Sequence, residues 1–449
     1  MKVDFTKGLG EFKHLNCINL GPVLSNVYSY ELTKAYYRKI NAAAVRLHDV
    51  PLCNPGMRLV DIHQIFSNFD ADENAPENYY FEQTDDYIKE CIDLGMEICY
   101  RLGESIEHSP KKYFIHPPKD FAKWARICSH IVAHYNDGWA DGFHWNIKYW
   151  IFWCEPNEWK LWSGTTEQYF ELYKVTAPLL KKEHPEIKIG GPAWGSGGTC
   201  PDKMEAFLKF CSDNSLPLDV FTWNQYHQLV PFMLAMPAKF KEMAANYGYP
   251  DVEIQIGEWH YMHRSWRALK TPDTAEDVLH PIYGIQGIES AAYTASVLMG
   301  FEDTPLDKAF FYTGNAGAFG MLDKDRNPTK LYYALEAYGT LMRYPHRVFA
   351  EPDILSPQLQ HDLASQKGDC MILAGKDDNG DAAILVSFMF DIAIDFQLEI
   401  NGLERFDAQV RAIDKEKDLD NAVFTRRGNT LTIRKPSYCA IYLIEMSHL

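Results

Sequence analysis

Two glutamates follow apolar segments of this chain, in surroundings where a carboxylate is costly unless it is used or paired. Glu155 ends the stretch that begins at Trp150, and Glu258 ends the stretch that begins at Ile254. Two facing carboxylic groups, one protonated and one ionised, form the arrangement that glycoside cleavage requires. The alternative is that each glutamate is simply an ion-paired residue at the end of a strand.

Other side chains that could contact a sugar stand at or next to the ends of predicted strands. They are His48, Cys154, Asn157, Tyr226, His227, Trp259, His260 and Tyr312. Aromatic rings can stack on the apolar C–H face of a sugar, and the polar residues can bind hydroxyls or orient a carboxylate. Each candidate has a plainer alternative in core packing, because the chain has 62 aromatic residues and a buried histidine is often a satisfied core residue.

Motifs for metal or nucleotide chemistry are weak. The pair His260 and His263 has no third ligand at metal-binding spacing. The glycine-rich stretch 195–198 has no adjoining Lys-Ser or Lys-Thr, so it does not match a phosphate-binding loop. None of the ten cysteines belongs to a Cys-x-x-Cys pair. We therefore expect neither a metal ion nor an organic cofactor.

The segments that must position these residues alternate between strand and helix. We expect strands at 15–20, 44–48, 96–101, 147–155, 187–192, 219–225, 252–258 and 308–313, and helices at 30–40, 82–94, 118–136, 165–183, 202–214, 237–247, 283–300 and 328–343. Eight strand–helix pairs predict an α/β fold, a (β/α)8 TIM barrel over residues 15–345. Glu155 and Glu258 would end the fourth and seventh strands, and they can therefore face each other across the barrel mouth.

The remaining sequence has a different periodicity. After about residue 350, short β-forming runs are separated by Asp-Asn-Gly and Asn-Gly turns, which predicts an additional antiparallel β-sandwich over 346–449. Residues 1–14 could add a strand to it. The loop from 49 to about 80 is unusually long, and loops of such length are often functional.

Composition excludes several classes of partner. The net charge is −17, which argues against nucleic acid or an anionic membrane as a partner. No apolar run reaches the roughly 18 residues of a membrane-spanning helix. The first eight residues lack the apolar core of a signal peptide, and most cysteines sit in apolar segments, where we expect them to be reduced. We therefore expect a cytoplasmic protein.

Six segments, taken together and in order, resemble glycoside hydrolase family 39. They are Val45–Asp49, Trp153–Asn157, Leu172–Ala177, Ile189–Ala193, Asp219–His227 and Gly257–Trp259. This family lies in the clan of retaining barrel glycosidases that includes β-xylosidases and α-L-iduronidases. The resemblance implies that Glu155 is the acid/base, that Glu258 is the nucleophile and that His48 contacts the substrate. It also implies an accessory role for the β-sandwich, often one in assembly, so a homo-oligomer is an open expectation.

Two physical expectations accompany this assignment. For a retaining enzyme, the carboxyl groups should lie about 5–5.5 Å apart. The pKa of Glu155 should be raised, because Trp153 and Trp159 would desolvate its carboxyl group and the charge of Glu258 would oppose its ionisation.

Cys154 departs from the family pattern, which has asparagine before the acid. In the family that asparagine grips the sugar 2-hydroxyl, whereas a thiol is a weak donor. The pocket could therefore suit a sugar whose 2-position is substituted or differently oriented, or activity could be feeble. Strand alternation offers a third outcome, in which Cys154 points away from Glu155 and packs behind the barrel. We expect a retaining, xylosidase-like glycosidase that acts on a terminal sugar; the rival is a weak or inactive carbohydrate-binding barrel.

Overall fold

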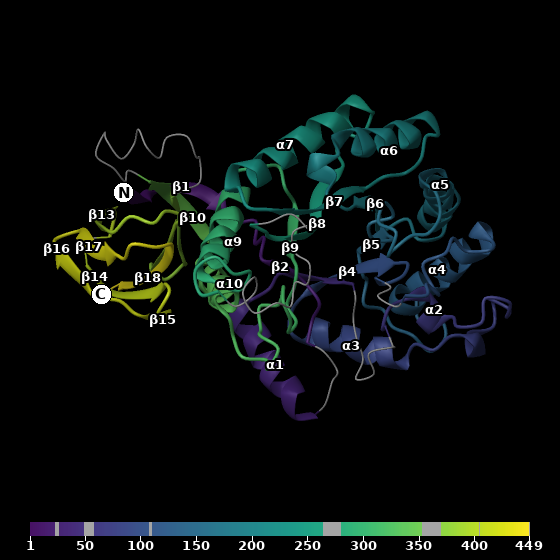
Figure 1. Ribbon diagram of the computed structural model, residues 1–449, viewed down its shortest axis with the longest axis horizontal. Helices are drawn as coiled ribbons and strands as arrows, with labels where there is room; N and C mark the ends of the chain where they lie inside the picture. Colours follow the sequence, from purple (N-terminus) through teal and green to yellow (C-terminus); the bar gives the residue numbers. More distant parts are fainter. Residues whose placement is uncertain are drawn as a thin grey trace.

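The computed structural model describes residues 1–22, 27–48, 58–106, 110–263, 280–352, 370–403 and 405–448. Within these ranges the chain forms a closed parallel barrel with helices around it and, beside the barrel, a ten-stranded sheet (Figure 1). The predicted fold class, a TIM barrel with an additional β-sandwich-like part, is confirmed. The exact boundaries proposed for the two parts stay a prediction.

Eight strands close the barrel in sequence order. They are β2 (Cys17–Asn19), β3 (Ala44–Leu47), β4 (Glu97–Leu102), β5 (Tyr149–Phe152), β6 (Lys188–Trp194), β7 (Val220–His227), β8 (Glu253–Tyr261) and β9 (Lys308–Phe311). Strand β9 pairs in parallel with β2 and completes the ring. Most strand residues are buried, as expected for a parallel sheet that is covered on its outer face.

In the ranges that the structure describes, eight long helices alternate with these strands. They are α1 (Val27–Ile40), α3 (Glu82–Asp93), α4 (Phe121–Asn136), α5 (Thr166–Glu183), α6 (Pro201–Asp213), α7 (Val230–Asn246), α9 (Ile288–Phe301) and α10 (Lys330–Leu341). Side chains fix several of their starts: Asp120 caps α4, and Thr165 forms a reciprocal capping box with Gln168 at α5. The predicted start of α7 at 237 is wrong, because Pro237 lies inside the helix and the first turn already contains Pro231.

The long loop after β3 is described only from residue 58, so its first part, 49–57, lies outside the described residues. The described part contains two short helices, α2 (Ile62–Ile65) and η1 (Pro76–Asn78). Asp61, just before α2, is buried and accepts hydrogen bonds from the Arg101 side chain and from both the backbone N–H and the hydroxyl of Ser105. These bonds tie the loop to the end of β4.

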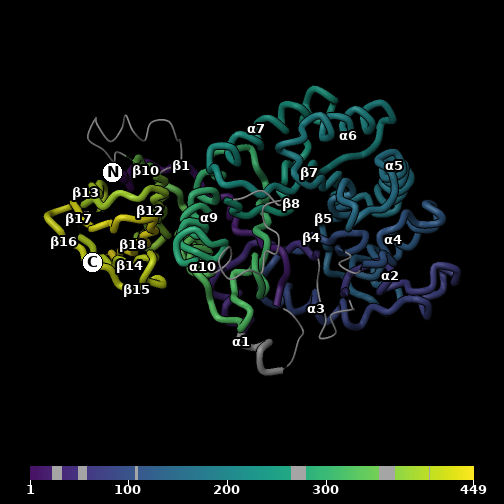
Figure 2. Tube along the Cα trace, in the orientation of Figure 1, coloured from purple at the N-terminus to yellow at the C-terminus, as the bar shows by residue number. Residues whose placement is uncertain are grey.

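The second sheet contains the first strand of the chain. Its strands, in spatial order, are β15 (Asp418–Asn421), β14 (Phe406–Ile413), β18 (Ala440–His448), β12 (Ala382–Phe388), β11 (Cys370–Lys376), β10 (His346–Glu351), β1 (Lys2–Glu11), β13 (Ile394–Asn401), β17 (Thr430–Lys435) and β16 (Phe424–Arg427). Strand β1 pairs antiparallel with β10 and parallel with β13, which makes it an interior strand. In Figure 2 the purple β1 accordingly lies among strands from the far end of the sequence.

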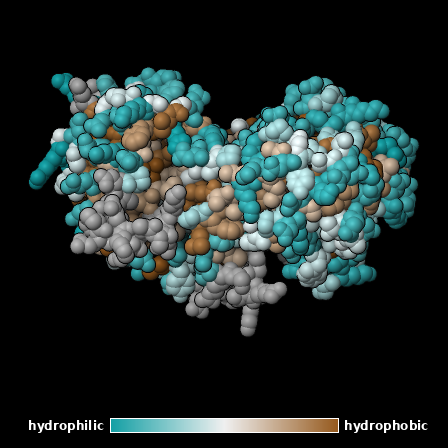
Figure 3. All heavy atoms as spheres, turned by 90° about the horizontal axis from the view of Figure 1, so that it is seen from above, coloured by the Kyte–Doolittle hydropathy of each residue, from teal (hydrophilic) through white to brown (hydrophobic). Residues whose placement is uncertain are grey.

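Helix α9 lies between the barrel and this sheet. All of its residues except Glu289 are buried, and it contacts β11, β12 and β18 on one side and β8 on the other. Two serine hydroxyls cross the junction: Ser296 donates to Ser387 at 3.0 Å, and Ser387 donates to the Ala292 carbonyl at 2.9 Å. The molecular surface narrows at this junction (Figure 3). An apolar helix with no solvent-facing side therefore joins the two parts.

Two further findings bear on the sequence expectations. No helix in the described part of the chain is both long and apolar enough to cross a membrane. None of the nine cysteines within the described ranges forms a disulfide with another of them; Cys53 lies outside these ranges.

Candidate active site

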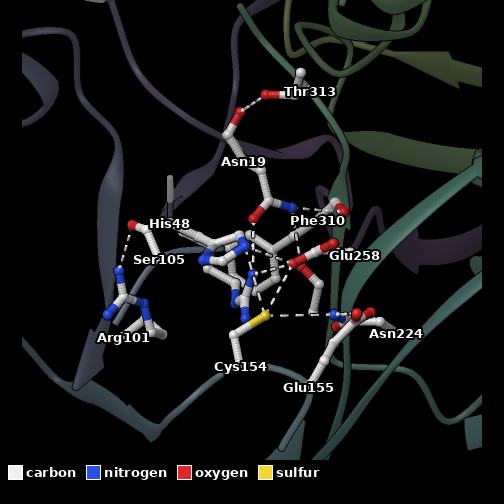
Figure 4. Close-up of polar contacts among 12 residues, drawn as sticks. Asn19, His48, Arg101, Ser105, Cys154, Glu155, Asn224, Glu258, Phe310 and Thr313 are labelled. Atoms are coloured by element: carbon white, nitrogen blue, oxygen red, sulfur yellow. Dashed lines mark hydrogen bonds and ion pairs between the residues drawn. The ribbon is translucent and has the colours of Figure 1, made fainter. Parts of the chain in front are cut away.

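The two predicted carboxylates lie at the same end of the barrel (Figure 4). Glu155 comes three residues after β5, and Glu258 lies within β8, where it is opposite Asn224 of β7 in the strand register. Near this position the register of β8 shifts against both of its neighbouring strands, β7 and β9. Irregularities of this kind re-aim a side chain, and they are common next to active sites.

The turn that carries Glu155 has an unusual backbone. Trp153 and Glu155 adopt positive φ angles of 61° and 43°, in the left-handed region that bulky residues rarely enter. Backbone bonds from Trp153 N to the Leu102 carbonyl (2.6 Å) and from Glu155 N to the Ala193 carbonyl (2.9 Å) hold the turn against β4 and β6. Strained residues that are held in this way cluster at functional sites.

Glu258 is 5% exposed and is surrounded by donors. Its Oε1 accepts from Arg46 Nη1 at 2.9 Å and from Cys154 Sγ at 3.2 Å, and its Oε2 accepts from the Tyr226 hydroxyl at 2.9 Å. The His48 ring nitrogen Nε2 lies 3.3 Å from Oε1. These contacts fix the carboxylate's orientation and compensate a charge that is removed from water.

Arg46 anchors Glu258 to the barrel interior. Its Nη1 also donates to Asn19 Oδ1 at 3.0 Å, and the Asn19 amide donates to the carbonyls of Gly257 and Phe310 at 2.9 and 3.1 Å. Burial alone would lower the pKa of Arg46, but interaction with Cys154 and Glu258 outweighs burial and raises it. The guanidinium is therefore a permanent positive charge beneath Glu258.

The side chain of Glu155 accepts a hydrogen bond from the Asn224 amide, which donates to Oε1 at 2.9 Å. Desolvation, followed by the charge of Glu258, raises the pKa of Glu155 to about 8, and the Asn224 hydrogen bond opposes that rise. The rise in the pKa of Glu155 agrees with the direction predicted from the sequence. A carboxyl group with this pKa is protonated at neutral pH and can donate a proton.

Trp153 and Trp159, the two rings expected to desolvate Glu155, contact other residues. Trp153 is buried and packs against Trp124 and Trp162, and its ring N–H donates to the Leu161 carbonyl at 2.7 Å. Trp159 is 64% exposed. The ammonium groups of Lys112 and Lys160 lie over the Trp159 ring, and desolvation of Glu155 by these two tryptophans stays a prediction.

Cys154 lies inside the site. Its sulfur is 3.2 Å from Glu258 Oε1, 3.5 Å from His48 Nε2 and 3.7 Å from Asn224 Nδ2. The alternative in which Cys154 packs behind the barrel is therefore wrong. Burial, and then the charge of Glu258, raises the pKa of the Cys154 thiol well above its ordinary value. The residue is therefore a neutral thiol in contact with the Glu258 carboxylate.

Three of the remaining candidates lie near Glu258. His48 and Tyr226 contact it directly, as described above. The ring of Tyr312 lies 6.5 Å from that of His48 and 6.2 Å from that of Tyr226, centroid to centroid. His48, Tyr226 and Tyr312 therefore flank one region of the barrel mouth.

The other candidates have structural partners. Asn157 exchanges two hydrogen bonds with the Gly195 backbone, at 3.0 and 2.8 Å, and so ties the turn after β5 to the one after β6. His227 accepts from Leu229 N at 3.0 Å and stacks on the Phe232 ring. Neither of these contacts reaches the two carboxylates.

Trp259 and His260 follow the nucleophile candidate but do not form a floor for a sugar. Trp259 is fully buried among Phe311, Tyr293 and Phe301, on the side of α9. Because side chains alternate along a strand, the residue after an inward-facing Glu258 faces the helices. The expectation that Trp259 contacts substrate is therefore wrong. His260 is also fully buried, its Nδ1 lies 2.8 Å from the Tyr261 carbonyl, and burial lowers its pKa to about 4.

Residue-by-residue reading of the sequence missed Arg46, Asn19 and Asn224. A signal for two of them was present in the sequence. Arg46 precedes His48 by two positions, and Asn224 precedes Tyr226 by two, so each shares a strand face with a residue that was singled out. Asn19 offered no comparable signal.

Comparison with known proteins gives one family match. Residues 16–252, more than half of the chain, match the model of glycosyl hydrolases family 39. A "Beta-xylosidase" of Caldicellulosiruptor saccharolyticus is 29% identical over 160 residues, 33% of this chain and 31% of that protein. A "Beta-xylosidase" of Geobacillus stearothermophilus is 24% identical over 250 residues, 50% of this chain and 47% of that protein. The matched regions thus span less than half of these curated relatives.

Solved structures share the whole architecture at low identity. A glucosidase from Croceicoccus marinus aligns over 100% of this chain and 98% of its own, with a TM-score of 0.76 and 20% identity. A monomeric beta-xylosidase from Caulobacter crescentus CB15 aligns over 100% and 99%, with a TM-score of 0.72 and 15% identity. At these identities the likeness establishes the fold alone.

Proposed function

This chain belongs to glycosyl hydrolases family 39, and from that membership and the geometry of its site we propose that it is a retaining glycosidase. It removes a terminal sugar by double displacement, with Glu155 as acid/base and Glu258 as nucleophile. A xyloside-like substrate is the first choice, because both curated relatives named above are beta-xylosidases.

The observation that carries this proposal is the contrast between the two carboxyl environments. Among the described residues, the side chain of Glu155 accepts one hydrogen bond, from Asn224, and its pKa is raised, which suits a proton donor. Glu258 is held by Arg46, Tyr226 and Cys154, which suits an oriented nucleophile. Two titratable groups whose environments differ in this way mark the acid and the nucleophile.

The reaction then follows from these roles. Glu155 gives its proton to the glycosidic oxygen while Glu258 attacks the anomeric carbon, which forms a covalent glycosyl–enzyme and releases the aglycone. Ionised Glu155 next takes a proton from water, and that water attacks the anomeric carbon and frees Glu258. Two inversions leave the anomeric configuration unchanged. The carboxyl separation of about 5–5.5 Å that retention requires stays part of the proposal.

Tyr226 and Arg46 have positioning roles in this scheme. Each donates to a different oxygen of Glu258, so the carboxylate cannot rotate about its last bond without losing a hydrogen bond. Fixing the nucleophile before attack lowers the entropic part of the barrier.

The test is activity on a panel of aryl glycosides, measured with the intact protein and with Glu258→Ala. We expect turnover of at least one pyranoside by the intact protein, with a first product of retained configuration in NMR spectra. The Glu258→Ala variant should lose nearly all of that activity, and its melting temperature serves as the folding control. An inverted first product, or full activity in the variant, would contradict the proposal.

Cys154 motivates a second candidate, a barrel that binds a carbohydrate and turns it over weakly or not at all. A thiol beside Glu258 replaces the amide that the family uses for the sugar 2-hydroxyl, and a thiol is a poor donor. The same panel separates the two functions, because a binding protein should show saturable sugar binding by calorimetry without turnover.

A further inference from the structure

Three side chains of the candidate active site bring metal-binding atoms together: Cys154, His48 and Glu258. The Cys154 sulfur lies 3.2 Å from Glu258 Oε1 and 3.5 Å from His48 Nε2, and Nε2 lies 3.3 Å from Oε1. All three side chains are buried. The three atoms form a nearly equilateral triangle of a sulfur, an imidazole nitrogen and a carboxylate oxygen, as the close-up shows (Figure 4).

This triangle has the dimensions of one face of a zinc tetrahedron. Zinc–ligand distances of about 2.3 Å to sulfur and about 2.0–2.2 Å to nitrogen or oxygen place tetrahedral ligand atoms roughly 3.3–3.6 Å apart. The observed sides agree to within a few tenths of an ångström. We propose that Cys154, His48 and Glu258 form a binding site for Zn²⁺ or a similarly thiophilic divalent cation.

The charges of the site can accommodate the ion. As the sulfur–zinc bond forms, Cys154 releases its proton to solvent. Thiolate and carboxylate then balance the two charges of Zn²⁺, and the site with the ion keeps the single positive charge of Arg46. Arg46 continues to donate to Glu258 Oε1, because a ligating carboxylate ordinarily keeps such an outer hydrogen bond. Three protein ligands leave a fourth position for water.

This site could not be predicted from sequence spacing, because Cys154 follows β5, His48 follows β3 and Glu258 lies in β8. Metal motifs that are recognised by spacing need two ligands close together in the chain. Only the fold brings these three residues within contact of one another.

A second cluster, Asp61, His63 and Glu104, has similar atom types but is a weaker candidate. Its oxygens are already engaged: Asp61 accepts from Arg101 and Ser105, and Glu104 accepts from the backbone N–H of His63 and contacts its ring. The cluster also lacks a sulfur. It therefore provides a control cluster, without a thiol, elsewhere in the same protein.

Zinc in this site would occupy the oxygen of the proposed nucleophile. The ion and a reacting sugar could not both use Glu258, so Zn²⁺ should inhibit turnover competitively. The inhibition rests on the proposed glycosidase function, whereas metal binding does not. This makes the two ideas separable by experiment.

The binding experiment uses the full chain after treatment with a chelator. We expect calorimetry and metal analysis to give one tight Zn²⁺ per chain, and Co²⁺ in its place to show a thiolate-to-metal charge-transfer band. The variants Cys154→Ala and His48→Ala should each weaken Zn²⁺ binding by more than the roughly 10–100-fold that loss of an outer partner causes. His63→Ala should leave the Zn²⁺ affinity and the Co²⁺ charge-transfer band unchanged. The melting temperature of each variant serves as its folding control.

The proposal is overturned if the intact chain binds no Zn²⁺, if the charge-transfer band is absent, or if affinity falls in His63→Ala and not in Cys154→Ala. Wherever the intact protein turns over a glycoside, Zn²⁺ should raise KM and a chelator should restore it. Zinc binding by a protein with no turnover would reject the glycosidase function and leave the metal site standing. Glycoside turnover by a protein that binds no zinc would reject the metal site and leave the glycosidase function standing.

Discussion

The sulfur of Cys154 lies 3.2 Å from Oε1 of Glu258, so the residue directly before the proposed acid contacts the proposed nucleophile. Adjacent residues of a regular strand point to opposite faces. Here the left-handed turn at Trp153 and Glu155 lets the neighbours Cys154 and Glu155 both face the site. The strained turn thus places a thiol and a carboxyl group on one side of the chain.

The first prediction follows from that contact. Replacing Cys154 with asparagine should raise kcat/KM on simple aryl pyranosides, on the order of tenfold, because an amide can donate to a sugar 2-hydroxyl and such bonds strengthen in the transition state. Steady-state kinetics on the panel measures this. Cys154→Ser is the matched control, since it keeps the size and adds a hydroxyl donor. A folded asparagine variant with no gain on any substrate would show that the missing amide does not limit this protein.

The second prediction concerns the proton donor. Glu155→Gln should lower kcat about 10²–10⁴-fold for substrates with poor leaving groups, and much less for activated aryl glycosides that need no protonation. The intact protein should lose activity as pH rises through the raised pKa of Glu155, and the variant should lack this basic limb. A pH–rate profile of each protein measures both effects. A basic limb that survives in the variant would remove Glu155 from the acid role.

The third prediction uses Asn224. Its hydrogen bond favours the ionised form of Glu155 and so lowers that pKa. Asn224→Ala removes this effect, and because the acid must be protonated, the basic limb should move to higher pH. Asn157→Ala is the comparison, since the side chain of Asn157, among the described residues, exchanges hydrogen bonds with the Gly195 backbone and not with Glu155. A basic limb of the pH–rate profile that stays at the same pH, or moves to lower pH, would argue against this role of the Asn224 amide.

The fourth prediction tests the support of Glu258. Tyr226→Phe removes the donor to Oε2, and a hydrogen bond to a charged group contributes about 1.5–3 kcal/mol. We expect kcat to fall roughly 10- to 100-fold, with a smaller change in KM. Phenylalanine retains the ring, so a lower melting temperature is not expected. A change confined to KM would place Tyr226 in substrate binding rather than in positioning.

The fifth prediction concerns the junction of the two parts. A fragment limited to residues 15–345 should be insoluble or poorly packed, because α9 would lose its cover of β11, β12 and β18. Exposed apolar surface of that extent leads to aggregation. Gel filtration and near-ultraviolet circular dichroism of the fragment give the answer. A soluble, monodisperse fragment with native signals would show that the sheet is dispensable.

Local pattern was enough for the barrel and for its two glutamates. Apolar runs and their breaks at residues such as Pro156 depend on nearby sequence, and they located all eight barrel strands. Contacts between different strands could not be predicted from local sequence. The hydrogen bond from Arg46 to Glu258 joins positions 212 residues apart. The face of β8 on which the Trp259 side chain lies depends on the register shift between β8 and β9.

The second sheet shows the same limit. Its Asn-Gly and Asp-Asn-Gly turns revealed a β-rich region, but β10, β14, β15 and β16 were not predicted as strands. The burial pattern of β13 alternates, whereas β15 and β16 are short and mostly exposed. Edge strands with few apolar residues carry little periodic signal.

The interior place of β1 has a consequence for biosynthesis. Its neighbours β10 and β13 leave the ribosome more than 330 residues later, a delay of roughly 20–80 s at 5–20 residues per second. During that time β1 has Val3 and Phe5 to bury and no sheet to join. Lys2, Asp4 and Lys7 interrupt its apolar residues with charge, as gatekeeper residues do beside aggregation-prone strands. The charged residues of β1 thus oppose aggregation of this strand until β10 and β13 have been synthesised and pair with it.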